Sequence, residues 1–411
     1  MQLKRWRSVI GLLTVIIVAV SASALGKENI IYGFKGAAGE REVAQQIIHD
    51  FNASRSDIEV ELLDMTAGGS WVEKLAVLFA GGTPPDVVRM EYQRSIGYIL
   101  DGMVRPLDPF IESDPTFRLR DFFPVAIQAH TVNGKVYGIP QEAQPFTMFV
   151  NTTLLGEHGF ATPGLKWTVD DLVSIARKIT RDIDQDGVVD IYGWQFDSSI
   201  TRFEPFLMAF GTRMLSADGS KSMLNSPEVL EAMQFYYEAA VQYGVKGGNF
   251  AQGTAAFYSL GGPWMVPGFR KSITGWDWDI LPMPGGPGGR GTTLGSDANY
   301  ISTASENPEA AWEFVKYLTS ADGLSMFTRE GNIIASRSQV AVNYIGRKAT
   351  EPPYNLQAYL TGIEISRPTQ VFKRFIEADN LFGKIMGQLW GNQISLPAAL
   401  DTLATQINAM L

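Results

Sequence analysis

Four aspartates and a glycine near the middle of the chain have the spacing of a cation-binding loop. They are Asp182, Asp184, Asp186, Gly187 and Asp190, at positions 1, 3, 5, 6 and 9 of an EF-type loop. Carboxylates at alternate positions can wrap a hard cation, and the glycine permits the sharp turn. Position 12, usually a glutamate, is Gly193, and the residues that follow have the pattern of a strand. Two interpretations stay open, a structural calcium site and a hairpin turn closed by aspartate side chains.

Aromatic residues are the second group that could do chemistry. Sugars stack their flat C–H faces on aromatic rings, while carboxylate, amide and guanidinium groups hold their hydroxyls. The chain has 9 tryptophans and 14 tyrosines but 3 histidines. Trp71 follows Gly69-Ser70, and Trp264 ends the segment Gly261-Gly262-Pro263-Trp264. Glycine-rich segments of this kind form loops, so both rings are candidate sugar platforms, with packing between structural units as the alternative for each.

Composition excludes several other kinds of site. The 411 residues contain no cysteine, which excludes disulfides, zinc–thiolate and iron–sulfur centres, cysteine nucleophiles and lipidation on cysteine. Three histidines far apart in sequence argue against a multi-histidine metal centre. The net charge of −9 argues against nucleic acid as a partner, because nucleic acid requires a basic face. A hydrophobic content of 45% is that of a globular protein.

Strands and helices alternate in the first hundred residues. Short apolar runs rich in β-branched residues predict strands, and apolar residues at helical spacing predict helices between them. The order predicts a parallel sheet with helices on both faces, an α/β fold that binds ligands at the carboxyl ends of its strands. The predicted strands are 30–34, 58–62 and 86–90, the helical stripes are 43–51 and 72–79, and the loops at strand ends are 35–39, 66–71 and 91–94. Glu91 directly follows a buried strand, and Asp297 follows Gly295-Ser296 in a similar place.

The first 24 residues have the form of a secretory signal peptide. Lys4, Arg5 and Arg7 precede an apolar run from 9 to 20, and Ser21-Ala22-Ser23-Ala24 supplies a cleavage pattern. The run is shorter than the roughly 20 residues that a membrane-spanning helix needs, so we predict cleavage after Ala24. Loss of three positive charges takes the net charge from −9 to −12. The mature protein is expected in the periplasm or another extracytoplasmic space, without a lipid anchor.

Seven segments spread along the chain together carry a family resemblance. They are 81–88 (GGTPPDVV), 133–140 (NGKVYGIP), 151–155 (NTTLL), 261–264 (GGPW), 281–286 (LPMPGG), 295–297 (GSD) and 307–319 (NPEAAWEFVKYLT). In this order they resemble the family 1 extracytoplasmic solute-binding proteins of ABC importers, the group that is similar to the maltose-binding protein. The resemblance covers nearly the whole mature chain. One departure is Val150, where the family has a tyrosine before the asparagine.

The resemblance implies two α/β lobes of the type II periplasmic-binding-protein fold, joined by three crossings and closing on ligand like a hinge. By analogy, the crossings lie near 141–145, 280–282 and 333–337. Lobe one would comprise residues 25–142 and 282–333, and lobe two residues 143–281 and 334–411.

The resemblance also suggests ligand contacts by position. Lobe one would offer Gly36, Ser70, Trp71, Glu91, Tyr92 and Gln93, and its returning strand Asp297 and Asn299. Lobe two would offer Phe203, Trp264 and Arg367. The family often has a glutamate at the hinge; Gln144 is the nearest match by position and Glu142 lies two residues earlier, so which of the two contacts ligand stays open.

The leading interpretation is a monomeric binding protein that captures a carbohydrate, a di- or oligosaccharide, and delivers it to the membrane permease of an ABC importer. It requires no cofactor, apart from the structural calcium considered above. One alternative is a secreted carbohydrate-active enzyme of the glycoside hydrolase kind, since the same side chains would serve it. Another is the same fold with a polyol, a glycerophosphodiester or an amino sugar as cargo. A phosphate would require several cations, for which the candidates are Arg89, Arg94, Arg202 and Arg367.

Overall fold

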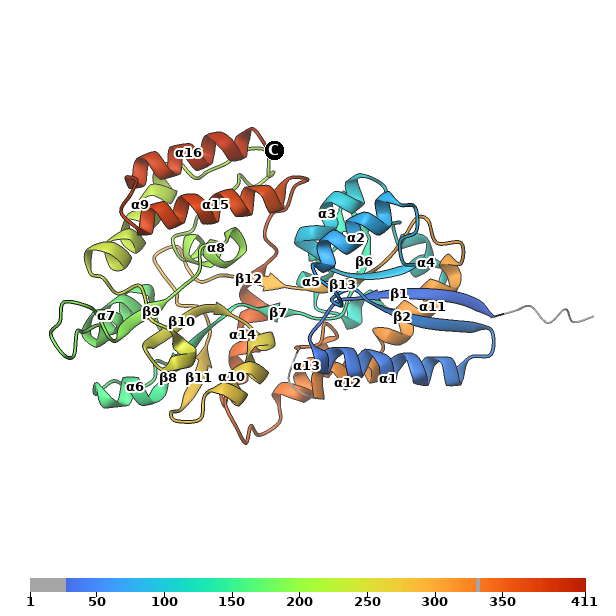
Figure 1. Ribbon diagram of the computed structural model, residues 1–411, viewed down its shortest axis with the longest axis horizontal. Helices are drawn as coiled ribbons and strands as arrows, with labels where there is room; N and C mark the ends of the chain where they lie inside the picture. Colours follow the sequence, from blue (N-terminus) through green and yellow to red (C-terminus); the bar gives the residue numbers. More distant parts are fainter. Residues whose placement is uncertain (1–26, 330–332) are drawn as a thin grey trace, which may run out of the picture.

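The computed structural model describes residues 27–329 and 333–411, which form two lobes side by side (Figure 1). The predicted signal peptide and its cleavage site lie outside the described residues. Within the described part of the chain, no helix combines the length and the apolar character needed to cross a bilayer.

The first lobe is built on a five-stranded sheet in the order β2-β1-β3-β13-β6. β1 is parallel to β2 and β3, as the alternating pattern predicts, while β13 runs antiparallel between β3 and β6. The strands are β1 (Glu28–Phe34), β2 (Ile58–Asp64), β3 (Val87–Glu91), β6 (Gly138–Pro140) and β13 (Asp297–Ile301). β13 belongs to a segment some 200 residues later in the chain, so the first lobe is discontinuous in sequence.

Helices cover both faces of this sheet (Figure 1). α1 and α11 bury one face against Tyr32, and α2 and α3 bury the other against Val88 and Met90. The helices of this part are α1 (Ala38–Ser54), α2 (Trp71–Ala80), α3 (Tyr92–Leu100), α4 (Asp108–Ser113), α5 (Pro124–Ala129), α11 (Pro308–Leu318) and α12 (Ala321–Arg329). A small hairpin, β4 (Thr131–Val132) with β5 (Lys135–Val136), and a 3-10 turn, Leu119–Asp121, complete it. α13 (Ser338–Ile345) lies at the boundary, with Val340 in the first-lobe core and its other buried residues in a core shared with the second lobe.

The second lobe is built on a four-stranded sheet in the order β11-β8-β10-β9. Its strands are β8 (Thr147–Asn151), β9 (Tyr192–Gln195), β10 (Ala255–Gly261) and β11 (Trp278–Leu281). Its helices are α6 (Thr152–Glu157), α7 (Val169–Ile179), α8 (Ile200–Ala209), α9 (Pro227–Tyr237), α10 (Val266–Ser272), α15 (Phe375–Trp390) and α16 (Leu396–Asn408), with short turns at Glu238–Gln242, Phe250–Gln252 and Pro263–Met265. α15 and α16 cross above this lobe in Figure 1 and pack their buried faces into the same core as Trp194 and Phe206.

A small third sheet, in the order β14-β12-β7, lies where the two lobes join. Its strands are β7 (Gln144–Pro145), β12 (Thr292–Gly295) and β14 (Ser366–Arg367), and α14 (Gln357–Ile365) leads into the last of them. β7 and β12 cross the space between the lobes in Figure 1. Residues 333–337 also run beside the first crossing, because Glu142 forms a β-bridge with Ala335.

The second crossing lies later in the chain than residues 280–282, where it was expected. Residues 282–291 still pack on the second lobe: Met283 belongs to its core, and the indole Nε1 of Trp167 donates to the carbonyl of Pro282 at 2.8 Å. The chain passes between the lobes at β12. The reason is that the loop at 284–289 folds back on the second lobe, where the Gly288 amide donates to the Ala209 carbonyl at 2.8 Å.

Candidate functional site

A cavity of about 630 Å³ lies between the two lobes, with the hinge strands at its back. Its size is that of a small-molecule binding cleft. The first lobe contributes residues at the carboxyl ends of β1 and β3, and the second contributes α8, α15 and the segment from Trp264 to Gly268. The carboxyl ends of parallel strands point to one edge of their sheet, which is why loops distant in sequence meet here.

The floor of the cavity is a buried network of charged side chains. The Arg89 guanidinium is 3.0 Å from Glu40 Oε2, 3.2 Å from Glu142 Oε2 and 3.0 Å from Asp297 Oδ2. Lys35 Nζ is 2.7 Å from both Glu91 Oε1 and Asp297 Oδ2. Two cations therefore hold four carboxylates in one connected cluster.

The two hinge-side carboxylates of this cluster titrate in opposite directions. Burial, reinforced by the negative charge of Asp297, raises the pKa of Glu142. Burial also disfavours ionised Asp297, but Lys35 and Arg89 outweigh it and lower the pKa of Asp297. The proton of the cluster therefore resides on Glu142.

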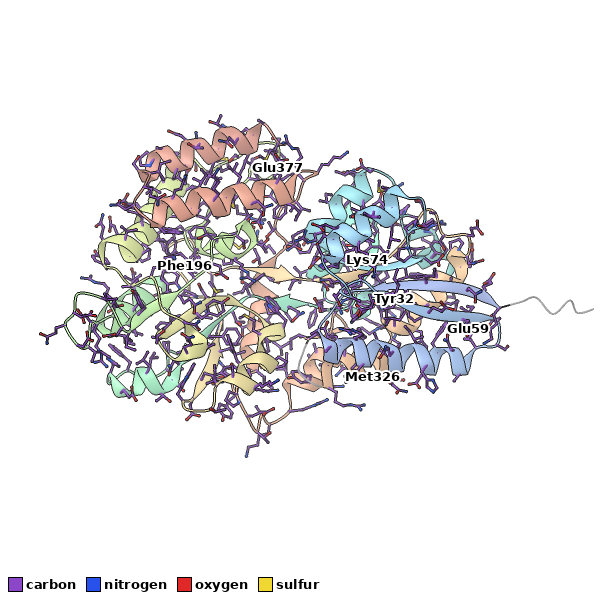
Figure 2. The ribbon with its side chains drawn as sticks, viewed as in Figure 1. Tyr32, Glu59, Lys74, Phe196, Met326 and Glu377 are labelled. Carbon is purple, nitrogen blue, oxygen red and sulfur yellow. The ribbon has the colours of Figure 1, made fainter. Side chains whose placement is uncertain are left out.

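Behind the floor, neutral hydrogen bonds hold the backbone in place. Ser296 Oγ donates to the Glu142 carbonyl at 2.7 Å and lies 2.9 Å from His130 Nε2. His130 is fully buried, and burial lowers its pKa to about 3. Tyr32, which lies within the first lobe in Figure 2, donates to Asn299 Oδ1 at 2.9 Å beneath the floor.

Trp264 supplies an aromatic surface from the second lobe. Its ring lies edge-on to Phe146, with centroids 5.3 Å apart, and both residues line the cavity. The backbone beneath the ring leaves little room for side chains: a Cβ on Gly262 would come within 2.0 Å of the Trp264 ring, and one on Gly295 within 3.3 Å. The ring is thereby held beside β12, next to the charged floor. It is placed to stack on the face of a sugar ring.

Polar groups of α8 and α15 complete the second-lobe wall. Thr201, Arg202 and Asp379 line the cavity. Asp379 Oδ1 accepts the Ile200 amide at 2.6 Å, and burial raises the pKa of this carboxyl. Arg202 forms an ion pair with Asp197.

The structure brings together about half of the residues expected at the site. Those that line the cavity are Gly36, Glu91, Gln93, Glu142, Gln144, Trp264 and Asp297. Both hinge candidates, Glu142 and Gln144, are therefore present.

The remaining expected residues lie elsewhere, each for a local reason. Ser70 caps the N-terminus of α2, where its Oγ accepts the Glu73 amide at 3.4 Å. Trp71 is the first residue of α2 and does not line the cavity. Its ring instead contacts two cations that do, Lys35 and Arg94. Asn299 is buried on β13 under the floor.

Three further expected contacts face away from the cavity. Phe203 is in the core of the second lobe, because α8 is buried on nearly all sides. Tyr92 and Arg367 line a different cavity on the other side of the hinge. There, the Tyr92 hydroxyl donates to the Leu294 carbonyl and accepts the Thr369 amide at 3.0 Å, which ties α3 to the hinge segments.

Several polar lining residues were not among the expected sugar contacts, although Arg89, Arg94 and Arg202 were considered for a phosphate cargo. They are Lys35, Glu40, Arg89, Arg94, Ser199, Thr201, Arg202, Ser296 and Asp379. Lys35 begins a predicted loop at the end of a strand, and this position could have identified it as a residue of the site. Arg89, considered from the sequence only as a phosphate contact, lies inside an apolar strand, and Glu40 lies on a helix, so only the tertiary pairing shows that they form one floor network.

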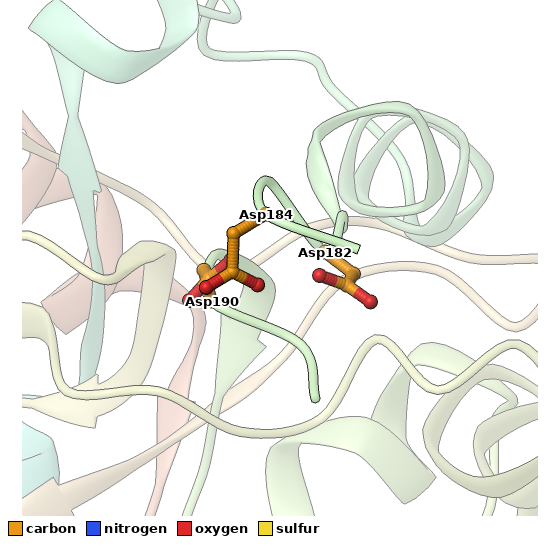
Figure 3. A group of neighbouring side chains, drawn as sticks. All are labelled: Asp182, Asp184 and Asp190. Atoms are coloured by element: carbon orange, nitrogen blue, oxygen red, sulfur yellow. The ribbon is translucent and has the colours of Figure 1, made fainter. Parts of the chain in front are cut away.

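The aspartate loop lies in the second lobe, away from the cleft, before β9. Ligand oxygens of Asp182, Asp184 and Asp190 lie within 4.8 Å of one another (Figure 3), and Asp186 is outside this group. Asp182 also accepts the Gln185 and Gly187 amides, both at 2.8 Å, as in a turn closed by its aspartates. The geometry is compatible with both interpretations.

Comparison with known proteins gives a family match. The model of the family described as "Bacterial extracellular solute-binding protein" matches residues 37–324. A putative binding protein of Brucella abortus (strain 2308) is 22% identical over 425 residues, covering 100% of each chain.

Two solved structures share the fold. An ABC substrate-binding protein from Listeria monocytogenes in complex with cycloalternan has a TM-score of 0.82 at 20% identity, covering 93% of this chain and 99% of its own. The maltose/maltodextrin-binding domain from Bdellovibrio bacteriovorus bound to maltotriose has a TM-score of 0.72 at 21% identity, covering 93% and 98%. These matches confirm the expected α/β, two-lobed binding-protein fold.

Proposed function

Because the chain belongs to the bacterial extracellular solute-binding protein family, we propose that it captures a di- or oligosaccharide between its lobes and delivers it to the permease of an ABC importer. The observation that carries this proposal is the cavity between the lobes, in which Trp264 faces a floor of carboxylates and amides. An aromatic face with converging hydrogen-bonding groups matches a sugar, which has apolar ring faces and hydroxyl edges. Solved relatives of the same fold hold cycloalternan and maltotriose.

The family is one of solute-binding proteins, which sets aside the alternative of a glycoside hydrolase. The cavity agrees with this assignment. A glycosidase needs one carboxylate that acts as acid and another that acts as base or nucleophile. Here Arg89 and Lys35 hold the floor carboxylates in ion pairs, an arrangement that suits groups which bind and orient a ligand.

A phosphate cargo is disfavoured by the same pairing. Among the arginines considered for this role, Arg89, Arg94 and Arg202 do line the cavity. Each already has a carboxylate partner, with Arg94 Nε 3.6 Å from Glu91 Oε2. Arg367 lines the cavity on the other side of the hinge. A glycerophosphodiester would therefore have to displace ion pairs in order to bind.

We propose that the mature protein acts as a monomer outside the cytoplasmic membrane after cleavage behind Ala24. Intact mass of the exported protein tests the cleavage, and gel filtration with light scattering tests the monomer. A mass that includes residues 1–24 would contradict the first, and a stable dimer would contradict the second.

A thermal-shift screen over neutral mono-, di- and oligosaccharides tests the proposed cargo. A ligand at a hundredfold excess over its Kd stabilises the folded state by about 2.7 kcal/mol, which gives a clear rise in melting temperature. We expect at least one di- or oligosaccharide to produce it. A screen in which only non-carbohydrate solutes do so would contradict the proposal.

A further inference from the structure

The charges around the interlobe cavity do not balance. Five carboxylates line it, together with four cations. One of these cations, Arg202, is paired with Asp197, which is not part of the lining. With Asp197 included, the carboxylates outnumber the cations by two. One of the two excess carboxylates is on the floor, where Arg89, Lys35 and Arg94 pair with four carboxylates. The other is Asp379 of the second-lobe wall, which accepts the Ile200 amide.

Among the four carboxylates of the floor, Glu142 has the weakest compensation. Its Oε2 is 3.2 Å from Arg89, which also pairs with Glu40 and Asp297. Among residues 27–329 and 333–411, no group donates a hydrogen bond to its Oε1. Its side chain is about 6% exposed. A buried carboxylate without a full counter-charge is costly, and the raised pKa of Glu142 reflects that cost.

Gln144 provides a second, independent sign of a ligand. It lines the same cavity and is 3% exposed, yet its Oε1 has no hydrogen-bond partner within the described part of the chain. This oxygen can only accept, so the ligand must donate to it. Gly295 pairs with Gln144 and lies against the Trp264 ring, so the acceptor, the carboxylate floor and the aromatic face are adjacent.

We propose that the cargo of this cleft is a carbohydrate bearing a protonated amine, whose ammonium group lies against Glu142 while a hydroxyl or N–H of the ligand donates to Gln144. The inference rests on the proposed function and specifies its substrate class. A neutral sugar satisfies Gln144 but leaves Glu142 to hold a proton in place of a counter-charge, and an anionic sugar adds negative charge to the cleft. An ammonium group supplies a hydrogen-bond donor and a cation that replaces the proton on Glu142, and the face of Trp264 attracts cations as well as sugar rings.

Calorimetric titration with two forms of one oligosaccharide that differ in charge tests this proposal. The probes are glucosamine oligosaccharides of two to four units and the same oligosaccharides N-acetylated, which replaces the ammonium group by a neutral amide. We expect the glucosamine forms to bind at least about tenfold more tightly, the difference made by one charge-assisted hydrogen bond. The isosteric variant Glu142→Gln should abolish that preference. Glu61→Gln, an exposed position on β2, should keep it.

The outcomes separate this inference from the proposed function. Tighter or equal binding of the acetylated forms, binding of neutral sugars alone, or a preference that survives Glu142→Gln would overturn the inference and leave carbohydrate binding in place. Failure of the glucosamine oligosaccharides and of all neutral sugars to bind would overturn both. Melting curves of the two variants verify that each is folded.

Discussion

Arg89 on β3 and Asp297 on β13 form a buried ion pair, with Nε 3.0 Å from Oδ2, although 208 residues separate them in sequence. β13 enters the first lobe only after the chain has built most of the second. The floor of the cleft is therefore complete only when both chain segments of the first lobe, the one with β3 and the later one with β13, are folded together. Assembly of the site thus depends on the discontinuous fold.

Loss of the Arg89 cation should destabilise the protein strongly. Arg89→Met leaves Glu40, Glu142 and Asp297 buried without their common counter-charge. We expect a loss of about 3–5 kcal/mol in the free energy of unfolding, measured by urea denaturation. The control is Arg55→Met, which breaks more exposed ion pairs with Asp57 and Glu313 and should cost much less. Similar losses for both variants would show that the floor network does not stabilise the fold.

The stability of the apo protein should fall as pH rises from about 6.5 to 8. Burial raises the pKa of Glu142 to about 8, so over this range the folded state holds a proton that the unfolded state has lost. Below pH 6.5, buried neutral His130, whose pKa is lowered to about 3, has the opposite effect, because there the unfolded state binds the extra proton.

Denaturation at several pH values with Glu142→Gln measures this effect. The variant should lack the fall, which is at most about 2 kcal/mol in the native protein. The same slope in both proteins would mean that Glu142 does not hold the proton.

Removal of Trp264 should weaken sugar binding far more than removal of Trp71. Trp264 lines the cavity, whereas Trp71 does not and only contacts the lining cations Lys35 and Arg94. For Trp264→Ala we expect a loss of about 1–3 kcal/mol in binding free energy by calorimetry, as for a buried aromatic contact. Trp71→Ala serves as the matched comparison. A larger effect at Trp71 would place the sugar platform in the first lobe.

If the aspartate loop binds calcium, the melting temperature should rise on addition of calcium to chelator-treated protein. Asp184→Asn should abolish this rise, since Asp184 belongs to the group that converges within 4.8 Å. Asp186→Asn, outside that group, should retain it. Identical melting with chelator and with calcium would leave the turn closed by its aspartates as the correct interpretation.

Local patterns were sufficient for the first three strands of the first lobe and for Glu91. Short apolar runs predict β1 and β3, alternating apolar residues predict β2, and a carboxylate at the end of a parallel strand falls at the ligand edge. The glycine-rich segment before Trp264 marked this ring as a candidate, and it lines the cavity, but the same signal also selected Trp71, which does not. Phe203 shows the limit: its helix is buried on nearly all sides, so its sequence does not tell which residues face the cleft.

Other features depend on tertiary pairing. The sequence places Arg89 within a buried strand. Its role in the floor becomes visible only in the folded structure, where carboxylates from α1, the hinge and β13 surround it. Arg367 was assigned to the cleft by position along the chain, but the pairing of β14 with β12 puts it beside the cavity on the other side of the hinge. The second crossing was expected too early because residues 282–291 fold back on the second lobe.

The central claim is that the cleft binds a carbohydrate without transforming it. The most direct measurement is calorimetric titration of the mature protein with the sugars that raise its melting temperature, followed by chromatography of the recovered sugar. We predict saturable binding at one site per chain, weakened by Trp264→Ala, and recovery of the sugar unchanged. Hydrolysis of the sugar, or binding unaffected by Trp264→Ala, would contradict the account.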